Sequence, residues 1–94
     1  MKQKAQATGQ LTIINDKGLH TRPSTELVRC TAKYKSKITL TYQKTTVDGK
    51  SLLGILALAA SKGAKIKITA DGQDAEEAIT ALTQLAKAQF HTEF

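Results

Sequence analysis

The chain has few of the residues that cross-link or rigidify a small protein or fill its core with aromatic rings. Among its 94 residues are one cysteine, one proline, two tyrosines, two phenylalanines and no tryptophan. Because Cys30 has no partner, it cannot form an internal disulfide, which agrees with a reducing compartment. No apolar run approaches the length of a membrane span. Residues 1–10 are polar and lack the apolar core of a secretory signal peptide. We therefore expect a soluble, cytoplasmic protein.

The length fits one small domain, because 94 residues with 40% hydrophobic composition support a single core. The sequence has no internal repeat and no low-complexity segment. We expect one domain over residues 1–94, with its core at about residues 11–87 and short flexible ends.

The net charge of +6 raises the possibility of a nucleic-acid partner. The lysines are dispersed, however, and the four aromatic residues are too few to suggest a base-stacking surface. The sequence lacks zinc-finger spacing, a basic heptad and an RNA-binding aromatic motif. We keep a basic nucleic-acid-binding module as the residual alternative, which a salt-dependent gel shift would favour. Acidic protein partners suit the charge better.

Hydrophobic periodicity predicts an α+β fold with the order β-α-β-β-α-β-α. The expected strands span residues 11–14, 38–42, 45–47 and 64–70, and the expected helices span residues 23–33, 52–58 and 75–86. Turn residues separate them at 15–18 and 71–72, and Gly63 is placed to end the second helix. We expect an open-faced β-sandwich, in which a four-stranded, mainly antiparallel sheet carries three helices on one face.

The first and last helices have apolar stripes that predict their inward faces. In the first helix the stripe contains Cys30, which we interpret as a small core residue rather than a reactive thiol. Asp74 and Glu77 resemble a capping box for the last helix. The tail after Lys87 is expected to fray, and His91 within it has no ligand-spaced partners, so we expect no metal site.

Residues 18–23, GLHTRP, form the most informative stretch of the sequence. Thr21 is an acceptable helix N-cap and Pro23 suits a first helical turn, so His20 is expected at the start of a helix. The backbone amides and the positive dipole end of that helix favour a bound anion, and Arg22 adds a permanent planar charge. This arrangement suits a phosphorylated imidazole.

The second predicted helix is short and rich in leucine. Ser51 stands at its N-cap position. One buried stripe cannot use all of its large aliphatic side chains, so some of them should be exposed. We expect Leu52, Leu53 and Leu56 to form a docking surface near His20.

The GLHTRP motif, together with residues 50–54, KSLLG, and the Asp71–Gly72 turn before a final helix, closely resembles the HPr family, the histidine-containing phosphocarriers of the bacterial sugar phosphotransferase system. The likeness spans roughly residues 11–85, and Ser24 departs from it by standing where alanine is frequent. The resemblance implies that His20 accepts a phosphoryl group on Nδ1 from enzyme I, charged by phosphoenolpyruvate, and passes it to IIA domains of sugar permeases. It also implies that Arg22 contacts the phosphoryl group.

The resemblance further implies a carrier rather than an enzyme with turnover of its own, acting as a monomer without a cofactor or membrane contact. Ser51 matches a serine that, in some members, a dedicated HPr kinase/phosphorylase phosphorylates, with a transcriptional regulator as a further partner. An N-cap role, worth roughly 1 kcal/mol, would equally explain this serine. A related carrier that serves nitrogen-related regulation is the main alternative within the family.

Overall fold

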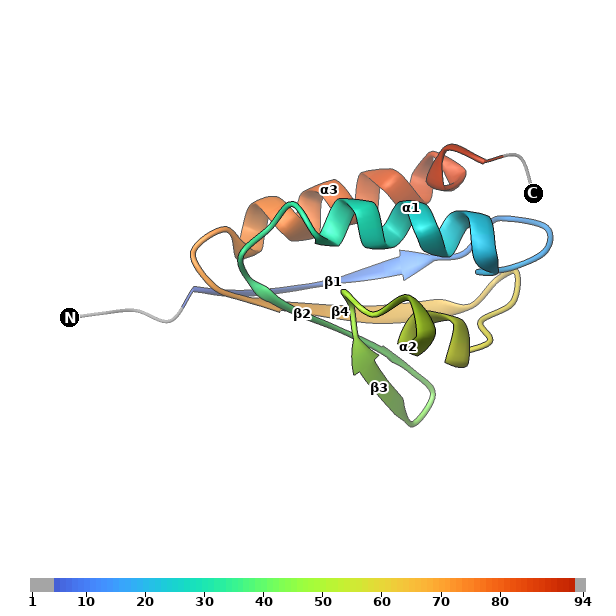
Figure 1. Ribbon diagram of the computed structural model, residues 1–94, viewed down its shortest axis with the longest axis horizontal. Coiled ribbons are helices and arrows are strands. Elements are labelled where there is room, and N and C mark those ends of the chain that lie inside the picture. The colour runs from blue at the N-terminus through green and yellow to red at the C-terminus, as the bar shows by residue number, and fades with distance from the viewer. Residues whose placement is uncertain (1–4, 93–94) are drawn as a thin grey trace.

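The computed structural model describes residues 5–92 and arranges them as a sheet with helices around one core (Figure 1). In chain order the elements are β1 (Gln6–Thr12), α1 (Thr21–Thr31), β2 (Lys37–Tyr42), β3 (Thr45–Asp48), α2 (Leu52–Ala57), β4 (Lys65–Asp71), α3 (Ala75–Lys87) and the 3₁₀ turn η1 (Gln89–His91). The predicted order is confirmed. Across residues 5–92, no helix combines the length and the apolar character that crossing a membrane requires.

The sheet has the strand order β1-β4-β2-β3 with every neighbouring pair antiparallel. Ile66 and Ile68 on β4 are fully buried, whereas Lys65 and Lys67, which alternate with them, are exposed, so this inner strand alternates between core and solvent. Helices α1 and α3 lie side by side over the core face, and the short α2 contacts α1 and β3 (Figure 1). The predicted α+β open-faced β-sandwich is confirmed.

Strand β1 begins at Gln6 rather than at Leu11, so the predicted start of this strand was too late. Its inward positions before Leu11 are the small residues Ala7 and Gly9, which give no apolar signal. They are small because α3 packs closely above them: a Cβ on Gly9 would lie 2.7 Å from Cγ2 of Ile79. Residues 1–4 and 93–94, where the remaining flexible ends were predicted, lie outside the described residues.

The segment after Lys87 is packed, and the prediction of a frayed tail is wrong as far as Thr92. Phe90 in η1 is fully buried in the core. The buried Asn15 side chain donates from Nδ2 to the Gln89 carbonyl, at 3.0 Å, and to the Thr92 hydroxyl, at 2.9 Å. An aromatic side chain and two hydrogen bonds therefore fix this segment beside the loop that precedes α1.

Helix α2 ends at Ala57, well before Gly63, which was predicted to end it. The terminating residue is Ala59, whose φ of 51° lies in the left-handed region. Gly63 instead closes the loop before β4, where its amide donates to the Ile13 carbonyl at 2.7 Å. The helix ends early because the chain turns toward the loop before α1. There the Ala60 carbonyl accepts a hydrogen bond from that loop.

Asp74 is the N-cap residue of α3, but the predicted capping box is wrong, because its side chain makes no cap hydrogen bond. The carboxylate accepts instead from the amides of Lys35 and Ser36, at 2.8 and 3.0 Å, and from the Ser36 hydroxyl. The Ser36 hydroxyl and the Lys35 amide hold the pKa of Asp74 below its ordinary value. The carboxylate thus ties the loop after α1 to the start of α3.

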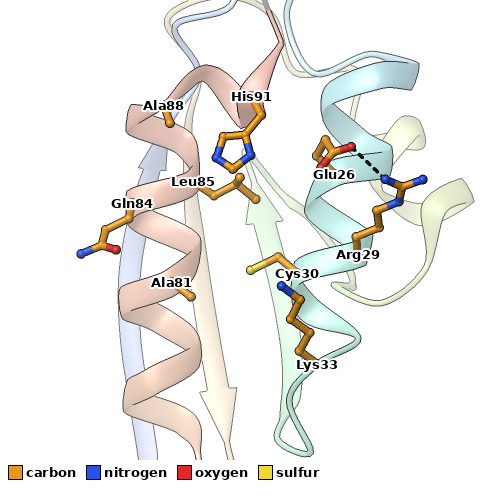
Figure 2. Close-up of a pocket in the computed structure, with 9 residues that line it drawn as sticks. All are labelled: Glu26, Arg29, Cys30, Lys33, Ala81, Gln84, Leu85, Ala88 and His91. Atoms are coloured by element: carbon orange, nitrogen blue, oxygen red, sulfur yellow. Dashed lines mark hydrogen bonds and ion pairs between the residues drawn. The ribbon is translucent and has the colours of Figure 1, made fainter.

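Helix α1 buries Leu27 and Thr31, whereas Cys30 is half-buried, so its assignment to the core was only partly right. An open hollow of about 550 Å³ lies between α1 and α3. Figure 2 shows Cys30 pointing into it, toward Ala81 and Leu85. Burial raises the pKa of the Cys30 thiol, and the charge of Lys33 opposes this effect. The raised pKa agrees with an unreactive thiol.

Candidate functional site

His20 is the N-cap residue of α1, with an extended backbone (φ −101°), and its side chain is exposed. Thr21, predicted as the N-cap, is instead the first helical residue. The reason is that the His20 carbonyl already accepts the first intrahelical bond, from the Ser24 amide at 2.9 Å. The amides of Thr21 and Arg22 therefore lie ahead of the helical ladder, at the positive end of the helix dipole.

A tight turn before α1 positions His20. Gly18 has a φ of 76°, which favours glycine, and its amide donates to the Asn15 carbonyl at 3.0 Å. The next amide, of Leu19, donates to the Ala60 carbonyl at 2.9 Å, and the Leu19 side chain is buried. A Cβ on Gly18 would lie 2.5 Å from the Ala60 oxygen. Close contact with the loop after α2 thus holds the turn, and with it the backbone of His20.

Ser24 supports the same turn from inside α1, a role that the sequence analysis did not identify. It is fully buried, and its hydroxyl donates to the Leu19 carbonyl at 3.1 Å. This bond satisfies the polar group that the serine brings into the core. It also links the residue before His20 to the first turn of the helix.

Two shallow hollows of about 250 Å³ each flank His20. One is lined by Lys17, His20, Thr21, Arg22 and Pro23. The other includes Lys17, His20 and Leu56, together with the loop after α2. The structure therefore brings His20, Thr21 and Arg22 together as predicted and sets Leu56 on the other side of the histidine. It also adds Lys17, which the sequence analysis had not singled out because an exposed loop lysine usually only solvates the surface.

Ser51 is the N-cap of α2, as predicted, and its hydroxyl accepts from the Gly54 amide at 3.0 Å. The helix buries Ile55 and exposes other aliphatic side chains: Leu53 is 80% exposed, Leu52 36%, and Leu56 is half-buried. Two of the three leucines expected on the docking surface are therefore exposed, and the half-buried Leu56 shares a hollow with His20.

The neighbouring Lys50 connects the turn before α2 to the loop after α1. Its ammonium donates to the Tyr34 carbonyl at 2.6 Å. This bond fixes the approach of the chain to Ser51. Within residues 5–92, no three histidine, cysteine or acidic side chains gather as a metal site would require.

The fold and this site define a class of protein: small α+β domains that present an exposed histidine at the N-terminus of a helix packed on an antiparallel sheet. The family model of the phosphotransferase-system HPr component phosphorylation site matches residues 7–88. The chain therefore belongs to the HPr family of the phosphotransferase system, and its curated relatives are phosphocarrier proteins.

Individual relatives support the same assignment. The chain is 40% identical over 80 residues to a phosphocarrier protein HPr of Neisseria meningitidis, with 85% of this chain and 90% of the relative covered. It matches the crystal structure of HPr-C-His from Thermoanaerobacter tengcongensis with a TM-score of 0.88 at 36% identity, covering 94% of this chain and 99% of that one. It also matches the crystal structure of an HPr dimer from that organism, with a TM-score of 0.73 at 39% identity, over 85% and 92% of the two chains.

Proposed function

We propose that Nδ1 of His20 accepts a phosphoryl group from enzyme I, charged by phosphoenolpyruvate, and passes it to IIA domains of sugar permeases. The observation that carries the proposal is the placement of an exposed imidazole at the N-cap of α1, in one open hollow with Arg22. A neutral imidazole nitrogen is a competent nucleophile near neutral pH. In the transfer, the Nδ1 lone pair bonds to phosphorus while the bond from phosphorus to the donor breaks.

Groups near His20 stabilise the negative charge of the phosphoryl oxygens, which makes transfer of the phosphoryl group to and from His20 easily reversible. Phosphoryl transfer depends mainly on positioning and on neutralising the charge of the phosphoryl oxygens. The Arg22 guanidinium and the amides at the start of α1, including that of Thr21, supply donors and positive charge for those oxygens. The protein carries the group as a covalent phosphohistidine and needs no cofactor for this step.

We infer that Leu52, Leu53 and Leu56 form the surface on which enzyme I and IIA domains dock in the cytoplasm. Leu52 and Leu53 are apolar and exposed, and the half-buried Leu56 lines the hollow beside His20. A partner that covers it would bring its own phosphoryl-bearing group to the imidazole. We propose a monomer as the active form, which light scattering at working concentration tests directly, since a dimer would double the mass.

The proposed function is tested by mixing the chain with enzyme I and phosphoenolpyruvate. The expected product carries one phosphoryl group that is lost in acid and retained in base, and His20→Ala does not form it. Transfer from the charged chain to different IIA domains then separates a sugar carrier from a nitrogen-related regulatory one. An active enzyme I that leaves the folded chain unmodified contradicts the carrier function.

We also propose that an ATP-dependent HPr kinase/phosphorylase regulates the carrier at Ser51. The hydroxyl oxygen caps α2, where a phosphate would remain compatible with the helix dipole. The same phosphate would set a dianion beside Leu52 and Leu53 and so oppose docking of an apolar partner surface. Ser51→Asp should therefore slow phosphorylation by enzyme I while far-ultraviolet circular dichroism stays unchanged, with Ser51→Ala as the matched control. A normal rate for Ser51→Asp would refute this regulation.

A further inference from the structure

We propose that Lys17 is a second cation for the phosphoryl group on His20, acting beside Arg22. The inference rests on the proposed function and adds to it a residue from the turn before α1. Its basis is placement: Lys17 and His20 line both of the hollows beside the imidazole, whereas Arg22 lines one of them.

The turn that carries Lys17 is well fixed. Its first residue, Asn15, is buried and accepts from the Gly18 amide, and Leu19 directly after the turn is bound to the Ala60 carbonyl. The backbone of Lys17 therefore keeps its position relative to His20. A lysine ammonium is a compact charge on a flexible stem, so it can follow phosphoryl oxygens as the group arrives and leaves. Arg22, on the helix, contributes a planar donor set from a different element.

The acidic residue of the turn, Asp16, is paired with a lysine from the loop before β4. Asp16, next to Lys17, is exposed and would repel a phosphoryl dianion. Its carboxylate accepts from the Lys62 ammonium at 2.9 Å, and that contact holds the pKa of Asp16 below its ordinary value. Pairing with Lys62 therefore reduces the repulsion that Asp16 would exert on a phosphoryl dianion at His20.

The expected contribution of Lys17 is modest, because the site is open to water. One exposed charge acting on a nearby dianion through solvent should change an equilibrium by about threefold at low salt. The effect should shrink as ionic strength rises, since the Debye length falls to about 3 Å at 1 M salt.

The test measures binding of inorganic phosphate to the unphosphorylated chain by NMR, from the backbone amide signals of Thr21 and Arg22. Lys17→Met should weaken binding about threefold at low salt, and Lys17→Arg should restore it. Lys67→Met is the matched control, because Lys67 is exposed on the open face of the sheet and its loss changes the net charge equally. Equal binding by Lys17→Met and Lys67→Met, or no phosphate binding at this site, would overturn the proposal.

A second measurement separates this proposal from the carrier function. Phosphoramidate phosphorylates histidine chemically, so ³¹P NMR can follow the phosphohistidine without enzyme I. The Lys17→Met substitution should shift the titration of the bound phosphoryl group toward higher pH than in Lys67→Met, because its dianion loses a neighbouring cation. A shift without any transfer from enzyme I would reject the carrier function and keep the contact, whereas normal transfer without a shift would reject the contact alone.

Discussion

Gly18→Ala should damage the site through the backbone, and Gly63→Ala provides a matched comparison. Both glycines have positive φ, 76° and 91°, so alanine is strained at either position by about 1–2 kcal/mol. They differ in surroundings. A Cβ on Gly18 would lie 2.5 Å from the Ala60 oxygen and 2.9 Å from Cα of Ser61, whereas a Cβ on Gly63 meets no atom within 4 Å.

The difference in stability between the two variants measures the effect of the close approach between Gly18 and the backbone of Ala60 and Ser61. Ala60 and Ser61 contribute backbone atoms that cannot rotate away, so relieving the overlap should cost about 1–3 kcal/mol more. The turn must move, and the hydrogen bond from the Leu19 amide to the Ala60 carbonyl weakens or breaks. Because His20 follows directly, we expect phosphorylation by enzyme I to slow about tenfold or more in Gly18→Ala.

Urea unfolding measures the stability of both variants, and initial rates with charged enzyme I measure their phosphorylation. Gly63→Ala should lose stability and keep its transfer rate. Gly18→Ala should lose more stability and also lose rate at temperatures where it remains fully folded. If the two variants match in both measurements, the turn does not position His20 in the way described above.

Three further changes test other parts of the account. Replacing Arg22 by alanine should slow transfer severely with an unchanged melting temperature, and near-normal transfer would contradict its role. Truncating Phe90 to alanine should cost about 3–5 kcal/mol in denaturant unfolding, since the side chain is fully buried, and a loss below 1 kcal/mol would mean the tail is not part of the core. Because the folded pKa of Asp74 is lowered, its stabilising contribution is complete above the unfolded pKa of about 3.9 and lost as pH falls through the folded value. Asp74→Asn should therefore reduce the acid dependence of stability, measured by urea unfolding from neutral to acidic pH, and an unchanged dependence would refute this assignment.

The sequence allowed prediction of those elements whose signal is local. Residues 64–70 alternate strictly between apolar and polar, and β4 is observed at Lys65–Asp71. Ser51 precedes an apolar helix and does cap it. The GLHTRP motif carries its own helix-start residues, so His20 could be assigned to the beginning of α1 to within one residue.

The remaining features depend on contacts between distant parts of the chain. Gly9 is an inward position of β1 over which Ile79 of α3 packs closely, and Phe90 is fully buried in the core formed by the preceding elements. Asp74 bonds to a loop 38 and 39 residues earlier in the chain rather than to its own helix. Lys17 lies beside His20 because the loop after α2 holds the turn that contains it. Local sequence patterns do not encode such contacts.

The central claim is that the imidazole at the start of α1 is the group that receives and releases phosphate. The most direct measurement is ³¹P NMR and intact mass of the chain after incubation with enzyme I and phosphoenolpyruvate, followed by addition of a IIA domain. The account predicts one phosphoryl group on Nδ1 of His20, absent in His20→Ala, that disappears when the acceptor is added. Phosphate on another residue, or on none while enzyme I is active, would contradict it.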